Sequence, residues 1–451
     1  MIKTAKVVTM FNFYTLTAAF IFLPILAFAA PASESCDSIK ASLGESWGYD
    51  TVTVPLDWNK PSKSSTIDIY YYFRKAAAVK DKTPIVFMNG GPTVAGARAA
   101  KMFDSIPALQ DQNLILIDQR GTGCSVGFPI YSPEMDMTQY QKFSSDSIVR
   151  DAEAIRQKMF GQAKWKVYGQ SYGGLISFRY LEMFPKSIYS AHIHGYGFWQ
   201  RPKEILDMRE KKLLEVSNEF FKFTNIKLSP QTAGEIIQNI LLSESLPAGQ
   251  SFAKMCIKTP GARKSEFCGY DLITGLFLTI GFKNFWPFVH ETVFKIDDYI
   301  QKNNLEALEK LFVQFSENYI LRFNEPNQAA ALQAITYNEL IPGHQFTDGC
   351  TPGIRNPIIS ECYIDENFLM LVSLGNMIPN PIKLSTVRRN IKRFNVPIYY
   401  YGGAFDSFIP PEMIRWTAEQ LDIKNQLVIF DNSGHEGYYT ESLLLKTLVE
   451  K

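Results

Sequence analysis

The run Gly-Gln-Ser-Tyr-Gly-Gly at residues 169–174 constrains the fold of this chain more than any other stretch. The β-branched and aromatic residues 165–168 precede it and are typical of a strand, and apolar residues at helical spacing follow it until Pro185. Glycines two residues before and after Ser171 fit a sharp turn from strand to helix, because larger side chains there would meet neighbouring backbone. Such a turn exposes the serine hydroxyl. Taken alone, the run also fits a turn without chemistry.

Short apolar segments on both sides of this turn predict an α/β fold. Two alternating segments predict an antiparallel pair at a sheet edge, and later continuous ones, alternating with helices, indicate buried parallel strands. In chain order the expected strands are 51–56, 66–73, 84–88, 114–117, 165–168, 188–193, 396–401 and 426–430. Between 201 and 383 the pattern is helical. It includes one long amphipathic helix with Leu305, Leu308, Leu311, Phe312, Phe315 and Tyr319 on one face. We therefore expect a mostly parallel eight-stranded sheet with a helical cap inserted after the sixth strand.

A nucleophilic Ser171 needs a base and an acid that orients the base. His435 lies in a glycine-bounded loop directly after the last expected strand, and Asp406 lies just past the penultimate one. The other histidines fit packed strand positions or fall in the insertion: His192, His194, His290 and His344. Serine, acid and then histidine is the chain order of the α/β-hydrolase triad, with each member at the carboxyl edge of the sheet.

The same chemistry needs two N–H donors for an oxyanion. The backbone of Tyr172, the residue after the serine, supplies one in such folds, and the loop after the third strand supplies the other. That loop reads Asn-Gly-Gly-Pro at 89–92. Because Pro92 has no N–H, Gly91 is the expected second donor.

Together, four runs resemble the prolyl iminopeptidase and tripeptidyl aminopeptidase family of α/β-hydrolases. They are residues 89–92, the run Asp-Gln-Arg-Gly-Thr-Gly-Cys-Ser at 118–125, residues 169–174, and the Gly-His pair at 434–435. Residues 284–287 and 334–339 also look like that family's cap, so the resemblance extends from about Tyr49 to Gly437. Three positions depart from the family pattern: Asn89 replaces a histidine, Thr93 a glycine, and Ile409 a threonine.

The resemblance implies hydrolysis, through an acyl-enzyme, of a peptide bond near a free N-terminus. Acidic cap residues of that family bind the substrate ammonium, and Glu339 matches one such position; it could otherwise be a solvated or helix-capping acid. Asp118 and Arg120 are expected to form a structural ion pair or turn brace behind the site. No cofactor or metal is expected. The alternatives are an esterase or lipase of small acyl esters and a non-catalytic hydrolase-fold binding protein, which the presence of all three triad residues disfavours.

The N-terminal segment predicts export. Lys3 and Lys6 precede a charge-free run up to Glu34. Ala-Phe-Ala at 27–29 favours cleavage before Ala30, and Ala-Pro-Ala at 30–32 is a second possible site, with cleavage before Ser33; an uncleaved membrane anchor is the alternative. The predicted organisation is a signal peptide at 1–29, a first core part at 30–200, the cap at 201–383 and a second core part at 384–451. The mature chain would carry a net charge of 44 − 45 = −1, because the signal holds two of the 46 basic residues and none of the 45 acidic ones. We therefore expect no nucleic-acid partner.

The six cysteines of the chain fit an exported protein with disulfides. The 12-residue spacings of Cys256/Cys268 and Cys350/Cys362 favour local pairs and leave Cys36 with Cys124, one of fifteen possible connectivities. Zinc binding is not expected, because no two cysteines have C-x-x-C spacing. The sequence does not determine the oligomeric state.

Overall fold

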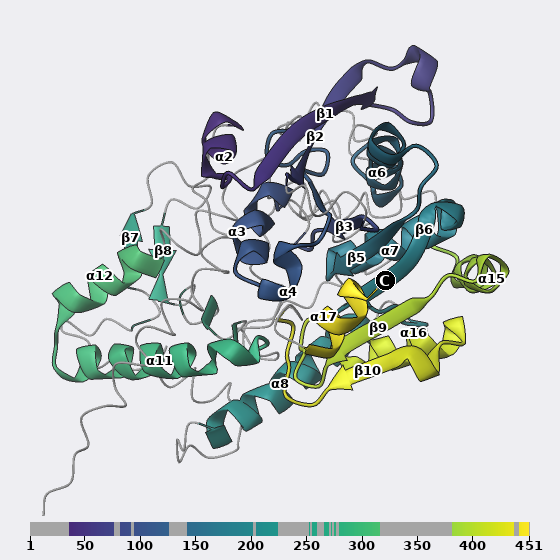
Figure 1. Cartoon of the computed structure of the whole chain (residues 1–451). Helices are drawn as coiled ribbons and strands as arrows, with labels where there is room; N and C mark the ends of the chain where they lie inside the picture. The colour runs from purple at the N-terminus through teal and green to yellow at the C-terminus, as the bar shows by residue number, and fades with distance from the viewer. Residues whose placement is uncertain are drawn as a thin grey trace, which may run out of the picture.

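A mostly parallel sheet of eight strands forms the centre of the protein (Figure 1). The computed structural model describes residues 36–75, 82–91, 94–125, 142–201, 204–223, 252, 255–258, 266–269, 272, 275–276, 279–315, 381–436 and 442–450. The strands are β1 (Trp47–Pro55), β2 (Thr66–Arg74), β3 (Ile85–Met88), β4 (Leu114–Ile117), β5 (Trp165–Gln170), β6 (Ile188–His194), β9 (Ile398–Gly403) and β10 (Leu427–Phe430). Their spatial order is β1-β2-β4-β3-β5-β6-β9-β10.

The strand directions confirm the predicted fold class. β1 pairs antiparallel with β2, which pairs antiparallel with β4, whereas all neighbours from β4 to β10 are parallel. The chain leaves the sheet after β6 and returns at β9, so the insertion follows the sixth strand as expected. Because the parallel strands share one direction, the loops after β3, β5, β9 and β10 meet at one edge of the sheet.

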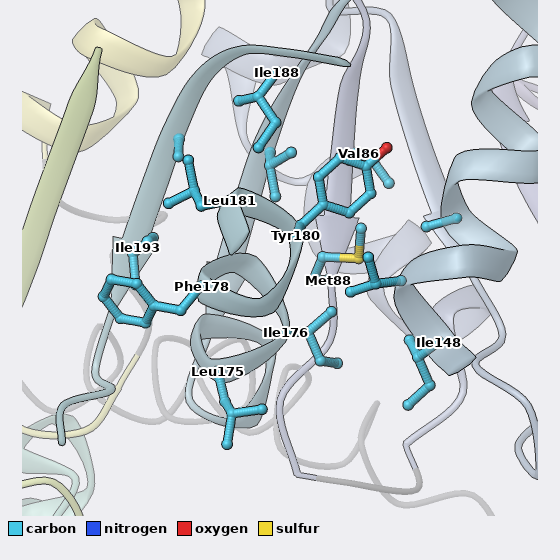
Figure 2. Packing of buried hydrophobic residues seen from close by; sticks show 14 of the residues in the cluster. Val86, Met88, Ile148, Leu175, Ile176, Phe178, Tyr180, Leu181, Ile188 and Ile193 are labelled. Carbon is cyan, nitrogen blue, oxygen red and sulfur yellow. The ribbon is translucent and has the colours of Figure 1, made fainter. Parts of the chain in front are cut away.

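Helices cover both faces of the sheet because its inner strands are apolar on both sides. Val86 and Met88 of β3 join one core cluster, and Ile85 and Phe87 join the other. The first cluster packs under α6 (Ser145–Phe160), α7 (Tyr172–Met183), α15 (Leu384–Phe394) and α16 (Pro411–Leu421). The second packs under α2 (Cys36–Ser42), α3 (Ala99–Asp104), α4 (Pro107–Gln110) and α17 (Ser442–Val449). Figure 2 shows side chains of α7, such as Ile176 and Phe178, within the first cluster.

The described part of the insertion has its own apolar cluster, formed around α8 (Ile205–Phe223), α11 (Trp286–Gln301) and α12 (Leu305–Phe315). Leu308, Phe312 and Phe315 are buried, as the amphipathic spacing predicts, and Leu311 is partly buried. Leu305, the first residue of α12, is 40% exposed. Tyr319 lies outside the described residues.

A two-stranded antiparallel sheet in the insertion, β7 (Cys256–Lys258) with β8 (Glu266–Cys268), was not predicted. Strands of three residues are too short to show an alternating pattern. The register places Cys256 opposite Cys268, and these two residues form a disulfide. The disulfide therefore closes a hairpin.

The second disulfide joins Cys36 at the start of α2 to Cys124 in the turn after β4. Two of the three expected pairings are thus present, and Cys350 and Cys362 lie outside the described residues, as does the predicted signal segment. In the part of the chain that the structure describes, no helix is both long and apolar enough to cross a membrane.

Candidate active site

Ser171 occupies the turn between β5 and α7 in a backbone conformation that is unusual for a non-glycine residue, with φ 54° and ψ −123°. Such a conformation costs about 1 kcal/mol or more and persists only where the surroundings impose it. The glycines of the run allow the turn: a Cβ on Gly173 would overlap the carbonyl oxygen of Met88, and one on Gly169 would overlap the carbonyl of Gly173. The Ser171 N–H donates to the carbonyl of His194 on β6 (3.0 Å). The turn thus holds a half-buried hydroxyl at the carboxyl edge of the sheet.

The structure brings the three predicted triad residues into one hydrogen-bonded chain. The distance from Ser171 Oγ to His435 Nε2 is 2.9 Å, and that from His435 Nδ1 to Asp406 Oδ2 is 2.7 Å. Asp406 follows β9 and His435 follows β10, and these strands are parallel neighbours. The arrangement can relay a proton from the hydroxyl to an imidazole that a carboxylate orients.

Two backbone groups fix the Asp406 carboxylate. Its Oδ1 accepts hydrogen bonds from the N–H groups of Phe408 (2.9 Å) and Ile409 (2.8 Å), which leaves Oδ2 for the imidazole. Asp406 is fully buried, so the carboxylate depends on these donors for its stabilisation. Ile409 stands where the resembling family has threonine; its backbone still donates and its side chain is buried in the core.

Aromatic side chains surround the imidazole of His435. Its ring lies 5.7 Å from that of Phe282, edge to face, and 5.1 Å from that of Phe408. Phe282 comes from the insertion. Of the aromatic residues that follow it, Phe285 and Trp286 are buried and Phe288 is partly buried. Apolar rings on two sides of an imidazole exclude water from it, which strengthens its polar contacts with the other two triad members.

The Asn-Gly-Gly loop after β3 passes directly beside the nucleophile. β3 pairs with β5 so that Met88 lies opposite Gly169, and a Cβ on Gly90 would lie 3.0 Å from the Cβ of Ser171. Gly91 is exposed and adopts φ +94°, which favours glycine. Tyr172 is the first residue of α7, so its N–H points toward the helix end that carries Ser171.

Asn89, which replaces the family's histidine, holds this loop in place. Its side-chain Nδ2 donates to the main-chain carbonyl of Val94 (3.0 Å), and the main-chain carbonyl of Asn89 accepts from Gln119 Nε2 (3.1 Å). The first bond closes the loop around Gly91, and the second attaches it to the turn after β4. Pro92 and Thr93 lie outside the described residues.

Asp118 and Arg120 brace the turn behind the site, which is one of the two arrangements expected from the sequence, and they do not pair with each other. Arg120 pairs with buried Asp151 on α6 (2.6 Å). Asp118 accepts instead from Tyr72 Oη (2.6 Å) and from the N–H of Cys124 (2.8 Å). Burial raises the pKa of the Asp118 carboxyl, which the hydrogen bonds partly oppose. The side-chain partners of the two groups, Tyr72 and Asp151, are remote in sequence, so spacing alone could not assign them.

The remaining histidines are not part of this chain of hydrogen bonds. His192 is fully buried, lies 3.0 Å from Ser190 Oγ and stacks on Tyr399, and burial lowers its pKa to about 3. Burial also lowers the pKa of His194, and the nearby His435 lowers it further. Both are packed strand residues, as the sequence predicted. His344 and Glu339 lie outside the described residues, whereas His290 lies on α11 in the cap.

Glu436 is a component of the site to which the sequence assigned no role. It follows His435 directly, is 7% exposed, and accepts a hydrogen bond from the backbone of Lys283 in the cap (2.9 Å). The only feature of the sequence that could have indicated this role is that Glu436 is an acidic residue next to a histidine in a glycine-bounded loop. Within the described residues, no group of three or more His, Cys, Asp or Glu side chains could hold a metal ion.

Comparison with known proteins agrees with this architecture. Residues 83–442 match the family model of the alpha/beta hydrolase fold, and the chain therefore belongs to that family. A proline iminopeptidase from Aeromonas sobria is 35% identical over 153 residues, which cover 32% of this chain and 36% of that protein. One from Neisseria gonorrhoeae is 28% identical over 143 residues, covering 32% of this chain and 42% of that protein.

The chain thus matches well under half the length of these curated relatives. Among solved structures, an acetylester hydrolase from Corynebacterium glutamicum aligns with a TM-score of 0.47 at 12% identity, covering 94% of this chain and 100% of that one.

Proposed function

We propose that this protein is a serine hydrolase of the aminopeptidase type that uses Ser171, His435 and Asp406 as its catalytic residues. The observation that carries the proposal is the hydrogen-bonded chain Ser171 Oγ–His435 Nε2–Nδ1–Asp406 Oδ2, with distances of 2.9 and 2.7 Å, on a strained turn after a parallel strand. A nucleophile, a base within hydrogen-bond reach and a third group that orients the base are the components of nucleophilic acyl transfer.

The reaction proceeds in two halves. As Ser171 Oγ attacks the substrate carbonyl carbon, its proton moves to His435 Nε2, and Asp406 stabilises the imidazolium. The backbone N–H groups of Gly91 and Tyr172 hold the negative oxygen of the tetrahedral intermediate. When the intermediate collapses, the C–N bond breaks, the amine departs with the proton from Nε2, and an acyl-serine remains. Water then attacks the ester by the same steps, which releases the acid and restores the hydroxyl.

The substrate is a peptide with a free N-terminus. The similarity to proline iminopeptidases supports this choice, together with the matching position of Glu339. A carboxylate in an apolar cleft would bind the substrate ammonium through charge-assisted hydrogen bonds and so limit how many residues precede the cleaved bond.

The protein acts after export, either secreted or in the periplasm. The disulfides Cys36–Cys124 and Cys256–Cys268 support this location, since such bonds persist in oxidising compartments. N-terminal sequencing of the purified protein should give Ala30 or Ser33 as the first residue. A terminus at Met1 would contradict cleavage.

The substrate class is tested with chromogenic amides of alanine, proline and Ala-Ala-Pro, each with a free and an acetylated N-terminus, beside a small acyl ester. We expect turnover of free-amine substrates, and loss of at least about 10³-fold in Ser171→Ala. Preferred cleavage of the acetylated amides or of the ester would refute the aminopeptidase assignment. Near-normal rates in Ser171→Ala would refute the nucleophile.

Glu339 is tested on the same pair of substrates. Glu339→Gln should lower kcat/KM for the free-amine peptide by roughly 10- to 100-fold, because one charge-assisted hydrogen bond is lost, and leave the acetylated peptide almost unchanged. Equal losses on both peptides would show that Glu339 does not bind the ammonium.

A further inference from the structure

A short cap segment lies directly on the loop that carries His435. The backbone N–H of His435 donates to the carbonyl of Gly281 (2.8 Å), and the N–H of Lys283 donates to Glu436 Oε2 (2.9 Å). Two adjacent residues of the histidine loop are therefore bound to the cap, one as a donor and one as an acceptor. The ring of Phe282, between the two cap residues, contacts the imidazole from the same segment.

The two chain segments pack at backbone contact. A Cβ on Gly434 would overlap the carbonyl of Gly281, and one on Gly281 would lie 2.9 Å from the ring of Phe408. The same cap segment reaches the loop after β9, where the rings of Trp286 and Phe405 lie 5.5 Å apart. Such close packing favours a single relative position of the two segments, because a shift of one against the other would bring backbone atoms into steric overlap.

The Glu436 carboxylate is stabilised there by backbone donors. Burial raises its pKa, nearby Asp406 adds to this effect, and the N–H groups of Gly434, Glu436 and Lys283 oppose it. The Lys283 ammonium lies elsewhere, 3.2 Å from Asn432 Oδ1 and 4.0 Å from the ring centre of Phe405. The connection between Lys283 and Glu436 therefore runs through the main chain, and the lysine side chain is not needed for it.

We propose that Glu436 is a positioning residue that fastens the His435 loop to the cap and thereby keeps Nε2 within reach of Ser171 Oγ. The inference rests on the proposed function of the triad. Asp406 fixes one side of the imidazole, whereas the backbone beside it depends on the cap through Gly281 and Lys283. A misplacement of a reacting group by about 1 Å can cost on the order of 10²-fold in rate, so this anchor bears directly on catalysis.

The test compares the full-length wild type with Glu436→Ala, Glu436→Gln and Lys283→Ala. The first readout is the rate at which a fluorophosphonate labels Ser171, which requires an activated serine but no particular peptide. The second is kcat and KM on the substrate that the wild type cleaves. We expect Glu436→Ala to lower the labelling rate and kcat by about 10- to 100-fold with KM within about twofold. Glu436→Gln keeps an acceptor oxygen and should recover most of that loss. Lys283→Ala keeps the donor N–H and removes only the exposed contact with Asn432 and the contact with the Phe405 ring, so its loss should be much smaller than that of Glu436→Ala.

A fourth variant removes the donor instead of the acceptor. Lys283 is the first residue of the 3-10 helix at Lys283–Phe285, and Phe282 before it is extended with φ −110° and ψ 98°, so proline fits at this position. Lys283→Pro should therefore lower the labelling rate as Glu436→Ala does, and it decides the question if Glu436→Ala does not fold.

Wild-type labelling rates in both Glu436→Ala and Lys283→Pro would overturn the positioning role while leaving the triad intact. A loss that appears in KM alone would overturn it as well. A wild type that the fluorophosphonate does not label would instead refute the proposed function, and the role of Glu436 with it.

Discussion

Asp406→Asn tests the catalytic proposal most sharply, because the structure dictates how the new amide must lie. Oδ1 of Asp406 accepts from the backbone N–H groups of Phe408 and Ile409, so the amide oxygen of an asparagine must face them. The opposite orientation would set an NH₂ group against two donors, at a cost of about 2 kcal/mol or more for two lost hydrogen bonds. About 30 molecules in 31 would then hold the NH₂ group toward His435.

An NH₂ group at this position reverses the role of His435 Nδ1. In the native protein Nδ1 lies 2.7 Å from a carboxylate oxygen and donates to it, which leaves Nε2 free to accept the proton of Ser171. With an asparagine, Nδ1 must accept, so the neutral ring carries its proton on Nε2 and cannot act as the base. We expect kcat to fall by roughly 10³- to 10⁴-fold, or about 4 to 5.5 kcal/mol of transition-state stabilisation.

The assay measures kcat on the best free-amine amide and the fluorophosphonate labelling rate, with thermal unfolding as the control for folding. Asparagine has nearly the volume of aspartate and removes a buried charge, so the unfolding midpoint should change little. Mass spectrometry must exclude deamidation, which would regenerate Asp406. A verified asparagine variant with kcat within tenfold of the wild type would refute the assigned tautomer and the role of Asp406.

Three further predictions concern the scaffold, each measured by urea unfolding. A Cβ at position 173 would overlap the carbonyl of Met88, so Gly173→Ala should lower the free energy of unfolding by about 1–3 kcal/mol or more. It should also slow the labelling of Ser171. An unchanged free energy of unfolding would show that this overlap is not the reason why a glycine is needed at this position. Arg120→Met should cost about 3–5 kcal/mol, since it leaves Asp151 buried and unpaired, and a cost below about 1 kcal/mol would contradict that pairing. The pKa of His192 is lowered to about 3, so the unfolded chain binds one more proton between about pH 3 and pH 6.5. Stability should therefore fall as pH falls through this window by about 1.4 kcal/mol per pH unit, and His192→Gln should flatten the slope by about one proton; an unchanged slope would show that His192 is already charged in the fold.

The sequence allowed the sheet and the relation of the triad residues to be predicted because each signal is local. The elbow at Ser171 is marked by glycines that steric contacts require, and Asp406 and His435 each follow a recognisable apolar strand. The end of β5 was less accurate: the strand continues to Gln170 instead of ending at residue 168, because Gly169 carries no strand propensity. Parallel neighbours then bring the loops together without any further information from the sequence.

Contacts between segments remote in the chain could not be predicted in this way. Arg120 pairs with Asp151, which is 31 residues away in the sequence, and Glu436 accepts a hydrogen bond from Lys283, which is 153 residues away. Neither pair lies at a helical or strand spacing, and each depends on how a loop packs once the sheet has formed. The cap segment around Phe282 is a short 3-10 turn without a repeating apolar pattern, so its sequence does not indicate which loop it contacts.

The contact between the cap and His435 also changes how variants of the cap must be interpreted. His435 donates its own N–H to Gly281, so a substitution elsewhere in the cap that shifts this segment can displace the base without touching the substrate. Such a variant would lose kcat on every substrate and react more slowly with a fluorophosphonate. A lost ammonium contact would instead spare acetylated substrates and leave the labelling rate unchanged. A fall in kcat for a cap variant therefore identifies a substrate-binding residue only when the labelling rate of Ser171 is preserved.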